Sequence, residues 1–342
     1  MPGKKTLTSI NDAQSPFFVG IDVGGTNTKV GIVDNHGATL AFRSIPTESH
    51  KGPQDAALRI GRTLQELIVE AGAVRSDLAR AGLVTPGPMD IAAGLLLNPG
   101  NLPEWHNCPI RGLVSVTCDL PVTFANDANA AAYGEYWRGA AEKYRSMVMF
   151  TLGTGVGGGI IVEEHLIEGN HGCGSELGHI IINCSEDAPE NSLGIRGTLE
   201  GYCGAYAIER RVREALAAGD ASSVRKRLEE GEEFSPKLLA EEAEAGDELS
   251  EHIVMETARY LGIGVTSTVH TIDPESVVIG GGVTFGGAGH PLGERFLGRV
   301  REVAYDNMFK TLQDKVSIEF ASLGGDAGYI GSAGLARREH FA

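Results

Sequence analysis

A glycine turn between two apolar β-type segments near the start of the chain carries residue types that bind phosphate. The stretch runs Asp22, Val23, Gly24, Gly25, Thr26, Asn27, Thr28, Lys29. Backbone N–H groups in such a turn can point at a phosphate, and glycine lets the oxygens approach because it has no Cβ. Asp22 at the end of the first segment could hold Mg²⁺ through water. The pattern is neither a Walker A motif nor a strand-to-helix GxGxxG fingerprint.

Two further glycine-rich turns follow later in the chain, at 151–159 and at 280–282. Each comes after an apolar run that is typical of a buried strand. One glycine loop is weak evidence, whereas three loops that each follow a strand indicate a site for a nucleoside triphosphate. The residues expected at the phosphates are Gly153, Thr154, Gly155, Gly157, Gly281 and Gly282. Gly155→Val should therefore weaken the apparent affinity for the nucleotide more than that for the second substrate.

The first two glycine turns have the same design and are 129 residues apart, with Gly24 aligned to Gly153 and Ile32 to Ile161. A repeated hairpin at this separation favours two related α/β lobes that face each other across a cleft. Glycine hairpins are common, so a coincidental match is the alternative.

The elements that must position these turns can be read from hydrophobic spacing. A helix is expected over 55–73, a strand over 81–84 that enters the turn at 85–88, and a strand at 122–124 followed by an alanine-rich helix from Asn126 to Trp137. The acidic stretch 208–264 is expected to form solvated helices, interrupted near Gly231 and Pro236. A buried strand at 277–279, a helix at 292–305 and a final helix at 331–337 that returns to the first lobe complete the chain.

Composition narrows the class of protein. The chain has 342 residues, of which 42% are apolar and 22% charged, so it is long enough for two domains and too apolar for general disorder. The 47 glycines are about twice the usual share, which indicates many close backbone approaches, as around phosphates. A net charge of −16 disfavours nucleic acid as a partner.

The cellular compartment is read from the cysteines and the start of the chain. Five cysteines without paired spacing predict free thiols in a reducing compartment, so we expect a cytoplasmic protein. The polar segment Met1–Pro16 lacks the apolar core of a signal peptide, and no apolar run reaches the roughly 18 residues that span a bilayer. No membrane role is expected.

Taken together, these motifs resemble the bacterial ROK group of repressors, uncharacterised frames and sugar kinases, and within it the ATP-dependent glucokinases. The likeness extends from about Phe17 to Ala336. Its pieces, in family order, are DVGGTNTKVGIVD at 22–34, TPGPMD at 85–90, NPGNLPEW at 98–105, NDANAAAYGE at 126–135, TLGTGVGGGI at 151–160, ELGH at 176–179, GTLE at 197–200 and VVIGGGV at 277–283.

The resemblance implies an α/β protein with the two-lobed actin-like ATPase fold of hexokinase, Hsp70 and actin, with a duplicated α/β core and an active-site cleft. The smaller lobe is expected at 17–128, completed by about 325–342, and the larger at 129–324. Lobe closure on the sugar would exclude water. A homo-oligomer, dimer or tetramer, is also implied.

The resemblance further implies that Asp127 is the catalytic base. An acidic side chain at a strand end can accept a hydroxyl proton as that hydroxyl attacks the γ-phosphate. The alternative is that Asn126 and Asp127 only cap the following helix, and both roles are compatible. The family's hydroxyl-binding positions correspond to Asn101, Asn126, Asp127, Glu176, His179 and Glu200. The expected reaction is phosphorylation of a hexose by Mg²⁺·ATP, best matched by glucose, with N-acetylglucosamine, mannose and fructose as alternatives and polyphosphate as an open phosphate donor.

One departure from the family concerns zinc. Most members have CxCGxxGCxE after the histidine, whereas this chain has Asn191, Leu193 and Thr198 at the three cysteine positions. We therefore expect no structural zinc, with Leu193 buried in its place and packing or hydrogen bonds holding His179. A substitute site of His179 with Cys184 and Cys203 is the alternative. Ser175 also replaces a glycine, so the backbone there is expected to differ slightly.

Two other functional classes are compatible with the family. A repressor needs a helix-turn-helix before the first glycine strand, and only 16 polar residues precede Phe17. A non-catalytic sugar sensor or actin-like ATPase needs no base, so the presence of Asp127 together with Glu176, His179 and Glu200 favours turnover.

Overall fold

A computed structural model describes residues 6–342; the first five residues of the polar start lie outside it. The described chain divides into two compact units. Unit 1 comprises the chain up to Lys143 together with Leu166–Gly174 and Leu323–Ala342, and unit 2 comprises Tyr144–His165 and Ser175–Ser322. We expected the first lobe to end at residue 128. It continues to Lys143 because the helix after residue 126 packs on the C-terminal helix.

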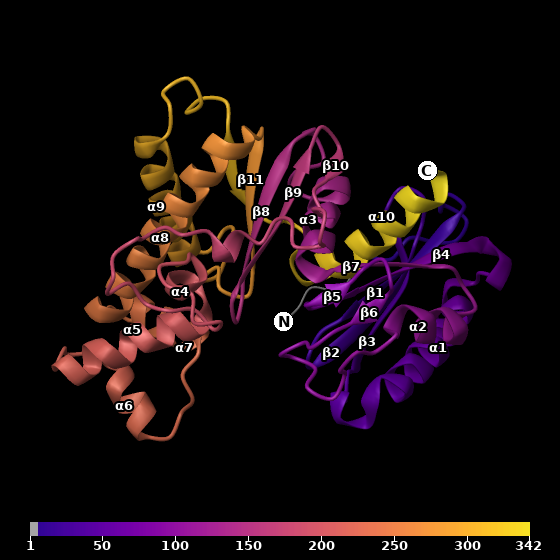
Figure 1. Ribbon diagram of the computed structural model, residues 1–342, viewed down its shortest axis with the longest axis horizontal. Helices are drawn as coiled ribbons and strands as arrows, with labels where there is room; N and C mark the ends of the chain where they lie inside the picture. Colours follow the sequence, from indigo (N-terminus) through magenta and orange to yellow (C-terminus); the bar gives the residue numbers. More distant parts are fainter. Residues whose placement is uncertain (1–5) are drawn as a thin grey trace. The chain divides into compact units, whose positions relative to one another are not determined.

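Both units contain strands and helices (Figure 1). The strands are β1 (Phe17–Val23), β2 (Asn27–Val33), β3 (Thr39–Pro46), β4 (Leu78–Thr85), β5 (Met89–Asp90), β6 (Leu95–Leu96), β7 (Val122–Asn126), β8 (Met147–Leu152), β9 (Val156–Val162), β10 (His165–Leu166), β11 (Ser276–Gly281) and β12 (Ser317–Phe320). The α-helices are α1 (Gly52–Ala71), α2 (Ile110–Cys118), α3 (Asp127–Arg138), α4 (Glu200–Cys203), α5 (Ala205–Ala218), α6 (Val224–Glu229), α7 (Pro236–Glu244), α8 (Glu248–Ile272), α9 (Pro291–Asn307) and α10 (Ala327–Phe341).

Unit 1 is built on a five-stranded sheet in the order β3-β2-β1-β4-β7. Strand β1 pairs antiparallel with β2 and parallel with β4, which is itself parallel to β7. Successive side chains of β1 point to opposite faces, so Val19 packs with α1 and α2 whereas Phe18 packs with α10. Both faces of the sheet are therefore covered by helices.

Helix α10 lies directly on β1 and β4. A Cβ at Gly20 would be 1.9 Å from Tyr329 O, and one at Gly82 would be 1.8 Å from Ser332 O. These two glycines are required by helix-on-sheet contact, so part of the glycine excess serves packing where we expected phosphate approaches.

Unit 2 repeats the sheet of unit 1, in the order β10-β9-β8-β11-β12 (Figure 1). The expected duplication is confirmed at the level of topology, since β8 pairs antiparallel with β9 and parallel with β11. One residue of the alignment was wrong. Four residues (24–27) connect the paired residues of the first hairpin and three (153–155) those of the second, so Ile32 corresponds to Ile160 and not to Ile161.

The acidic stretch forms four helices, α5 to α8, which pack around the core of unit 2. The break between α6 and α7 contains Gly231 and ends at Pro236, as the sequence predicts, whereas the breaks at 219–223 and 245–247 were not expected. Its surface acids are partly paired: Arg227 contacts Glu232, Glu241 and Glu242. Among residues 6–342, no helix combines the length and apolar character needed to cross a membrane.

Candidate active site

The candidate residues of unit 1 gather at the carboxyl ends of its parallel strands. In the sheet register, Asp22 of β1 is paired with Val84 of β4, and Thr85 with Asn126 of β7. Asp22 and the Asn126-Asp127 pair therefore lie at one edge of the sheet, because parallel strands end together. Ligands of α/β sheets bind at such edges.

Asp22 is a partly enclosed carboxylate. Lys29, its partner across the hairpin, places Nζ 3.7 Å from Oδ2 and also donates to Gly325 O at 2.5 Å. Gly328 of α10 is so near that a Cβ there would be 2.5 Å from Oδ2. Burial raises the pKa of Asp22, while Lys29 acts in the opposite direction. A charged carboxylate held in this way is suited to a nearby cation.

The first glycine turn presents exposed backbone at the same end of β1. Gly25, Thr26 and Asn27 are exposed, while Gly24 N–H donates to Asn27 O at 3.0 Å. A Cβ at Gly25 would be 3.0 Å from Asn101 O, so the structure brings the expected phosphate turn and an expected sugar residue together.

Asn126 and Asp127 begin helix α3. Asn126 Oδ1 accepts N–H from Ala128 at 2.9 Å and from Asn129 at 3.2 Å, and Asp127 Oδ1 accepts from Ala128 at 2.9 Å. Asn126 is thus the N-cap, as one of the two expectations stated. Asp127 is half-buried in the first turn, where the positive end of the helix dipole favours a carboxylate.

In unit 2 the other two glycine turns lie side by side at the ends of β8 and β11. Gly281 is paired with Leu152, has φ of 96°, and would bring a Cβ within 2.2 Å of Leu152 O. Nothing lies within 4 Å of a Cβ at Gly153 or Gly282. Thr154, next to Gly153, is exposed, whereas Gly157 lies inside β9, opposite Thr151. The two open glycines leave room for a ligand, whereas Gly281 serves the packing of the two strands.

A pocket of about 450 Å³ opens beside Gly282. Its volume is in the range of small-molecule sites. Helix α7 and the segment after β11 line it with Pro236, Lys237, Ala240, Glu241, Glu244, Gly282, Phe285, Gly286 and His290.

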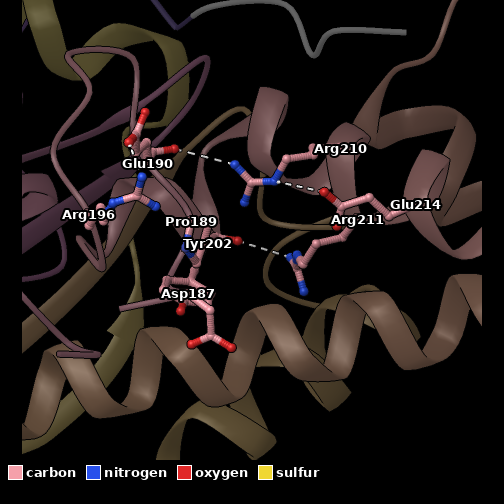
Figure 2. Close-up of a pocket in the computed structure, with 8 residues that line it drawn as sticks. All are labelled: Asp187, Pro189, Glu190, Arg196, Tyr202, Arg210, Arg211 and Glu214. Atoms are coloured by element: carbon pink, nitrogen blue, oxygen red, sulfur yellow. Dashed lines mark hydrogen bonds and ion pairs between the residues drawn. The ribbon is translucent and has the colours of Figure 1, made fainter. Parts of the chain in front are cut away.

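A second pocket, of about 600 Å³, lies elsewhere in unit 2 (Figure 2). It is lined by Asp187, Pro189, Glu190, Arg196, Tyr202, Arg210, Arg211 and Glu214. Its arginines are held by the protein itself: Arg196 pairs with Glu190 at 2.6 Å, Arg210 lies 3.6 Å from Glu214, and Arg211 donates to Tyr202 O at 3.0 Å. Three acids balance three arginines, so this pocket offers phosphate no net attraction.

Glu200 is the first residue of helix α4 and is only 7% exposed. Three hydrogen-bond donors contact its carboxylate. Val156 N–H donates to Oε2 at 3.1 Å, while Ser192 Oγ and Tyr206 OH donate to Oε1 at 2.9 and 3.1 Å. Burial, and then the charge of Glu200, raise the pKa of Tyr206 to about 12. The phenol therefore stays protonated and can keep donating.

The second glycine turn packs against this carboxylate. A Cβ at Gly155 would be 2.2 Å from Glu200 Oε2. A side chain at Gly155 would therefore meet Glu200, an expected sugar residue, while the effect of Gly155 substitutions on ATP stays a prediction.

His179 ends a 3₁₀ turn, Leu177–His179, and its Nδ1 lies 2.9 Å from Asn191 Nδ2. Glu176, just before the turn, is exposed. Leu193 does not replace zinc by burial: it is 70% exposed, because residues 191–195 form a tight turn whose hydrogen bonds converge on Asn191. Ser175 keeps a left-handed backbone with φ of 67°, the region that favours glycine.

The substitute zinc site of His179 with Cys184 and Cys203 is not formed. Cys203 is fully buried in the core of unit 2, where its thiol contacts Thr257 O and burial raises its pKa to about 12, whereas Cys184 is exposed. Within residues 6–342, no group of three or more His, Cys, Asp or Glu side chains could hold a metal ion.

Three contributors to the site were missed by motif reasoning: Asn191, Ser192 and Tyr206. Asn191 was noted only as a lost cysteine, although its place in the aligned motif put it beside His179. Ser192 and Tyr206 carry no sequence signal, since their contacts with Glu200 depend on how the turn folds back.

Comparisons with known proteins agree with this arrangement. The family model described as ROK family matches residues 18–339. A glucokinase of Thermotoga maritima is 32% identical over 318 residues, covering 93% of this chain and 96% of the relative. The crystal structure of a ROK hexokinase from Thermus thermophilus has a TM-score of 0.79 at 31% identity, covering 94% of this chain and 98% of that one. A ROK family glucokinase from Streptomyces griseus, solved with glucose and AMPPNP, has a TM-score of 0.73 at 28% identity and covers 94% and 99%.

Proposed function

Because the chain belongs to the ROK family and has the actin-like α/β fold of its sugar kinases, we propose that it is an ATP-dependent hexose kinase that converts glucose to glucose 6-phosphate. The observation that carries the proposal is the position of Asp127. Its carboxylate sits at the sheet edge that also bears Asp22 and the exposed turn 24–27.

In the proposed reaction, Asp127 accepts the proton of the sugar 6-hydroxyl. The hydroxyl oxygen forms a bond to the γ-phosphorus of ATP, and the bond from that phosphorus to the β-bridging oxygen breaks to release ADP. The cap made by Asn126 fixes the backbone from which Asp127 projects. The helix N-terminus favours the negative charge of this carboxylate, which suits the role of a base.

Sugar recognition is assigned to the polar side chains that the resemblance implies. Glu200 accepts and His179 contacts sugar hydroxyls, with Glu176, Asn101 and Asn126 at further hydroxyls. A site that hydrogen-bonds each hydroxyl rejects analogues that lack one, because its own polar groups would be left unpaired. The three donors already on Glu200 support this role, since they hold its carboxylate in one place.

The nucleotide is assigned to the glycine turns. The exposed turn 24–27 with Lys29, and the turn 153–155 with Gly282, would cradle the phosphates. The pocket beside Gly282 would take the adenosine, with Phe285 and Ala240 as apolar walls. Asp22 would hold Mg²⁺ through water, and a bound Mg²⁺ would neutralise charge on the phosphates.

A coupled assay of ADP release tests this function. Glucose should give the highest kcat/KM among glucose, mannose, fructose, N-acetylglucosamine and N-acetylmannosamine, with ATP and with polyphosphate as donors in separate runs. ATP hydrolysis without sugar is the control. Sugar binding without phosphorylation of any hexose would contradict the proposal and indicate a sensor or regulator.

The proposal includes a cytoplasmic homo-oligomer without zinc. The five cysteines, all free, support a reducing compartment. Light scattering of the purified protein would test for a dimer or tetramer. Elemental analysis that finds one zinc per chain would contradict the zinc-free assignment.

A further inference from the structure

The amide of Asn191 is oriented by the backbone around it. The residue is 7% exposed, and its Oδ1 accepts N–H from Leu193 at 3.0 Å and from Ile195 at 2.9 Å. Backbone N–H groups only donate, so the amide oxygen must face them and the amide cannot be flipped without loss of both bonds. The NH₂ group of Asn191 therefore faces His179.

This orientation decides which imidazole nitrogen carries the proton. Asn191 Nδ2 is 2.9 Å from His179 Nδ1, and an amide NH₂ cannot accept a hydrogen bond. Nδ1 must accept, so in the neutral ring the proton resides on Nε2. We propose that Asn191 is a positioning residue that fixes His179 as an Nε2–H donor for a sugar hydroxyl. This inference rests on the proposed function for its ligand, and on the hydrogen bonds alone for the tautomer.

Ser192, which follows Asn191 in the chain, orients Glu200 as Asn191 orients His179. Ser192 Oγ donates to Glu200 Oε1 at 2.9 Å, and the turn that carries both residues is closed by Asn191 N–H to Ile195 O and Gly194 N–H to Asn191 O. Two consecutive residues thus set one donor, His179, and one acceptor, Glu200. Hydroxyl groups can both accept and donate, so a fixed donor and a fixed acceptor suit a hydroxyl-bearing ligand, and no bound cation is needed to fix the ring.

The tautomer can be observed without any assay of activity. The ¹⁵N spectrum of protein labelled at the histidine ring nitrogens, taken at alkaline pH where the rings are neutral, separates protonated from bare nitrogens. The His179→Gln variant assigns the resonance. The wild type should show His179 with a bare Nδ1 and a protonated Nε2, and a protonated Nδ1 would overturn the proposal.

Substitution separates the amide's two tasks. Asn191→Asp keeps the acceptor for the two backbone N–H groups but demands a proton on Nδ1, so the neutral ring loses its Nε2–H. KM for glucose should rise about ten-fold with little change in kcat, and Asn191→Ala should raise it as much. If the residue only anchors the turn, Asn191→Asp should match the wild type and Asn191→Ala alone should be impaired, which would refute the inference.

Asn183→Asp is the matched control. Asn183 makes similar bonds nearby, donating from Nδ2 to Tyr202 OH at 2.7 Å and accepting from Ser185 N–H at 3.0 Å. Its variant should leave KM for glucose unchanged. If the wild-type protein phosphorylates no sugar, the proposed function fails while the ¹⁵N spectrum still decides the role of Asn191.

Discussion

The two glycine hairpins occupy equivalent places in their sheets but obtain their charged groups differently. In the β1-β2 hairpin, Asp22 and Lys29 are cross-strand partners, so acid and base come from the hairpin itself. In the β8-β9 hairpin the equivalent pair is Thr151 and Gly157, which carries no charge. Its carboxylate comes from Glu200, which bonds to Val156 from 44 residues away.

The two sheets therefore share their strand order but not the origin of the charged groups at their hairpins. The first turn is one residue longer and presents exposed backbone, while the second is pressed against Glu200 through Gly155. The charged groups at the first turn thus come from the hairpin itself, whereas the carboxylate at the second comes from a distant segment.

The largest expected effect tests the assignment of proton transfer to unit 1. Asp127→Asn keeps the shape at the start of α3 but cannot take the hydroxyl proton, so kcat should fall by about 10² to 10⁴, roughly 3 to 5 kcal/mol. Steady-state kinetics measures the change, and thermal unfolding checks that the fold is intact. A well-folded variant with near wild-type kcat would remove Asp127 as the base.

The next effect concerns the carboxylate recruited by unit 2. Glu200→Gln places an NH₂ group among three donors, so one of them must lose its acceptor. Loss of a hydrogen bond to a charged group costs about 1.5 to 3 kcal/mol. KM for glucose should rise roughly 10- to 100-fold. Titration of the sugar at saturating ATP measures this, and an unchanged KM would show that the carboxylate does not touch the sugar.

A pair of glycine substitutions sharpens the contrast within the second hairpin. Gly155→Ala forces a methyl group against Glu200 and should lower the free energy of unfolding by about 1 to 3 kcal/mol, with a higher KM for sugar. Gly153→Ala meets no neighbour, so it should leave stability and sugar KM unchanged and act only on ATP. Urea unfolding and paired titrations distinguish them; similar behaviour of the two variants would contradict the contact.

The smallest expected effect is the pH dependence of stability that Asp22 in the first hairpin causes. Burial raises the pKa of Asp22 above its usual 3.8. The contribution of Asp22 to the free energy of unfolding is therefore fully present below pH 3.8 and is lost as the pH rises through the raised pKa. At neutral pH the burial of Asp22 therefore lowers the free energy of unfolding, and Asp22→Asn removes this cost. The variant should unfold at higher urea than the wild type at pH 7, and the gap should close towards acidic pH. A gap that is constant with pH would show that ionisation of Asp22 does not matter.

Much of the architecture follows from sequence because it is local. Hydrophobic spacing places α1, β4 and α9 within a few residues, and a strand followed by Asn126 and an alanine-rich run predicts the cap at α3, because cap and helix are neighbours in the chain. The repeated hairpin indicates the duplicated sheet in the same way. Its one-residue error arose because alignment by glycines hides a turn that is shorter by one residue.

Contacts between segments that are far apart in the chain are visible only in the tertiary structure, because no hydrophobic periodicity in the sequence links such segments. Gly155 against Glu200, and Asn191 against His179, depend on the path of the turn at 191–195, which is set by hydrogen bonds from its own backbone. The sequence also could not show which glycines pack against other backbone and which face open space. Gly82 is fixed by α10 and Gly153 faces open space, yet both follow or lie in apolar strands, because the need for glycine is set by what packs against the backbone.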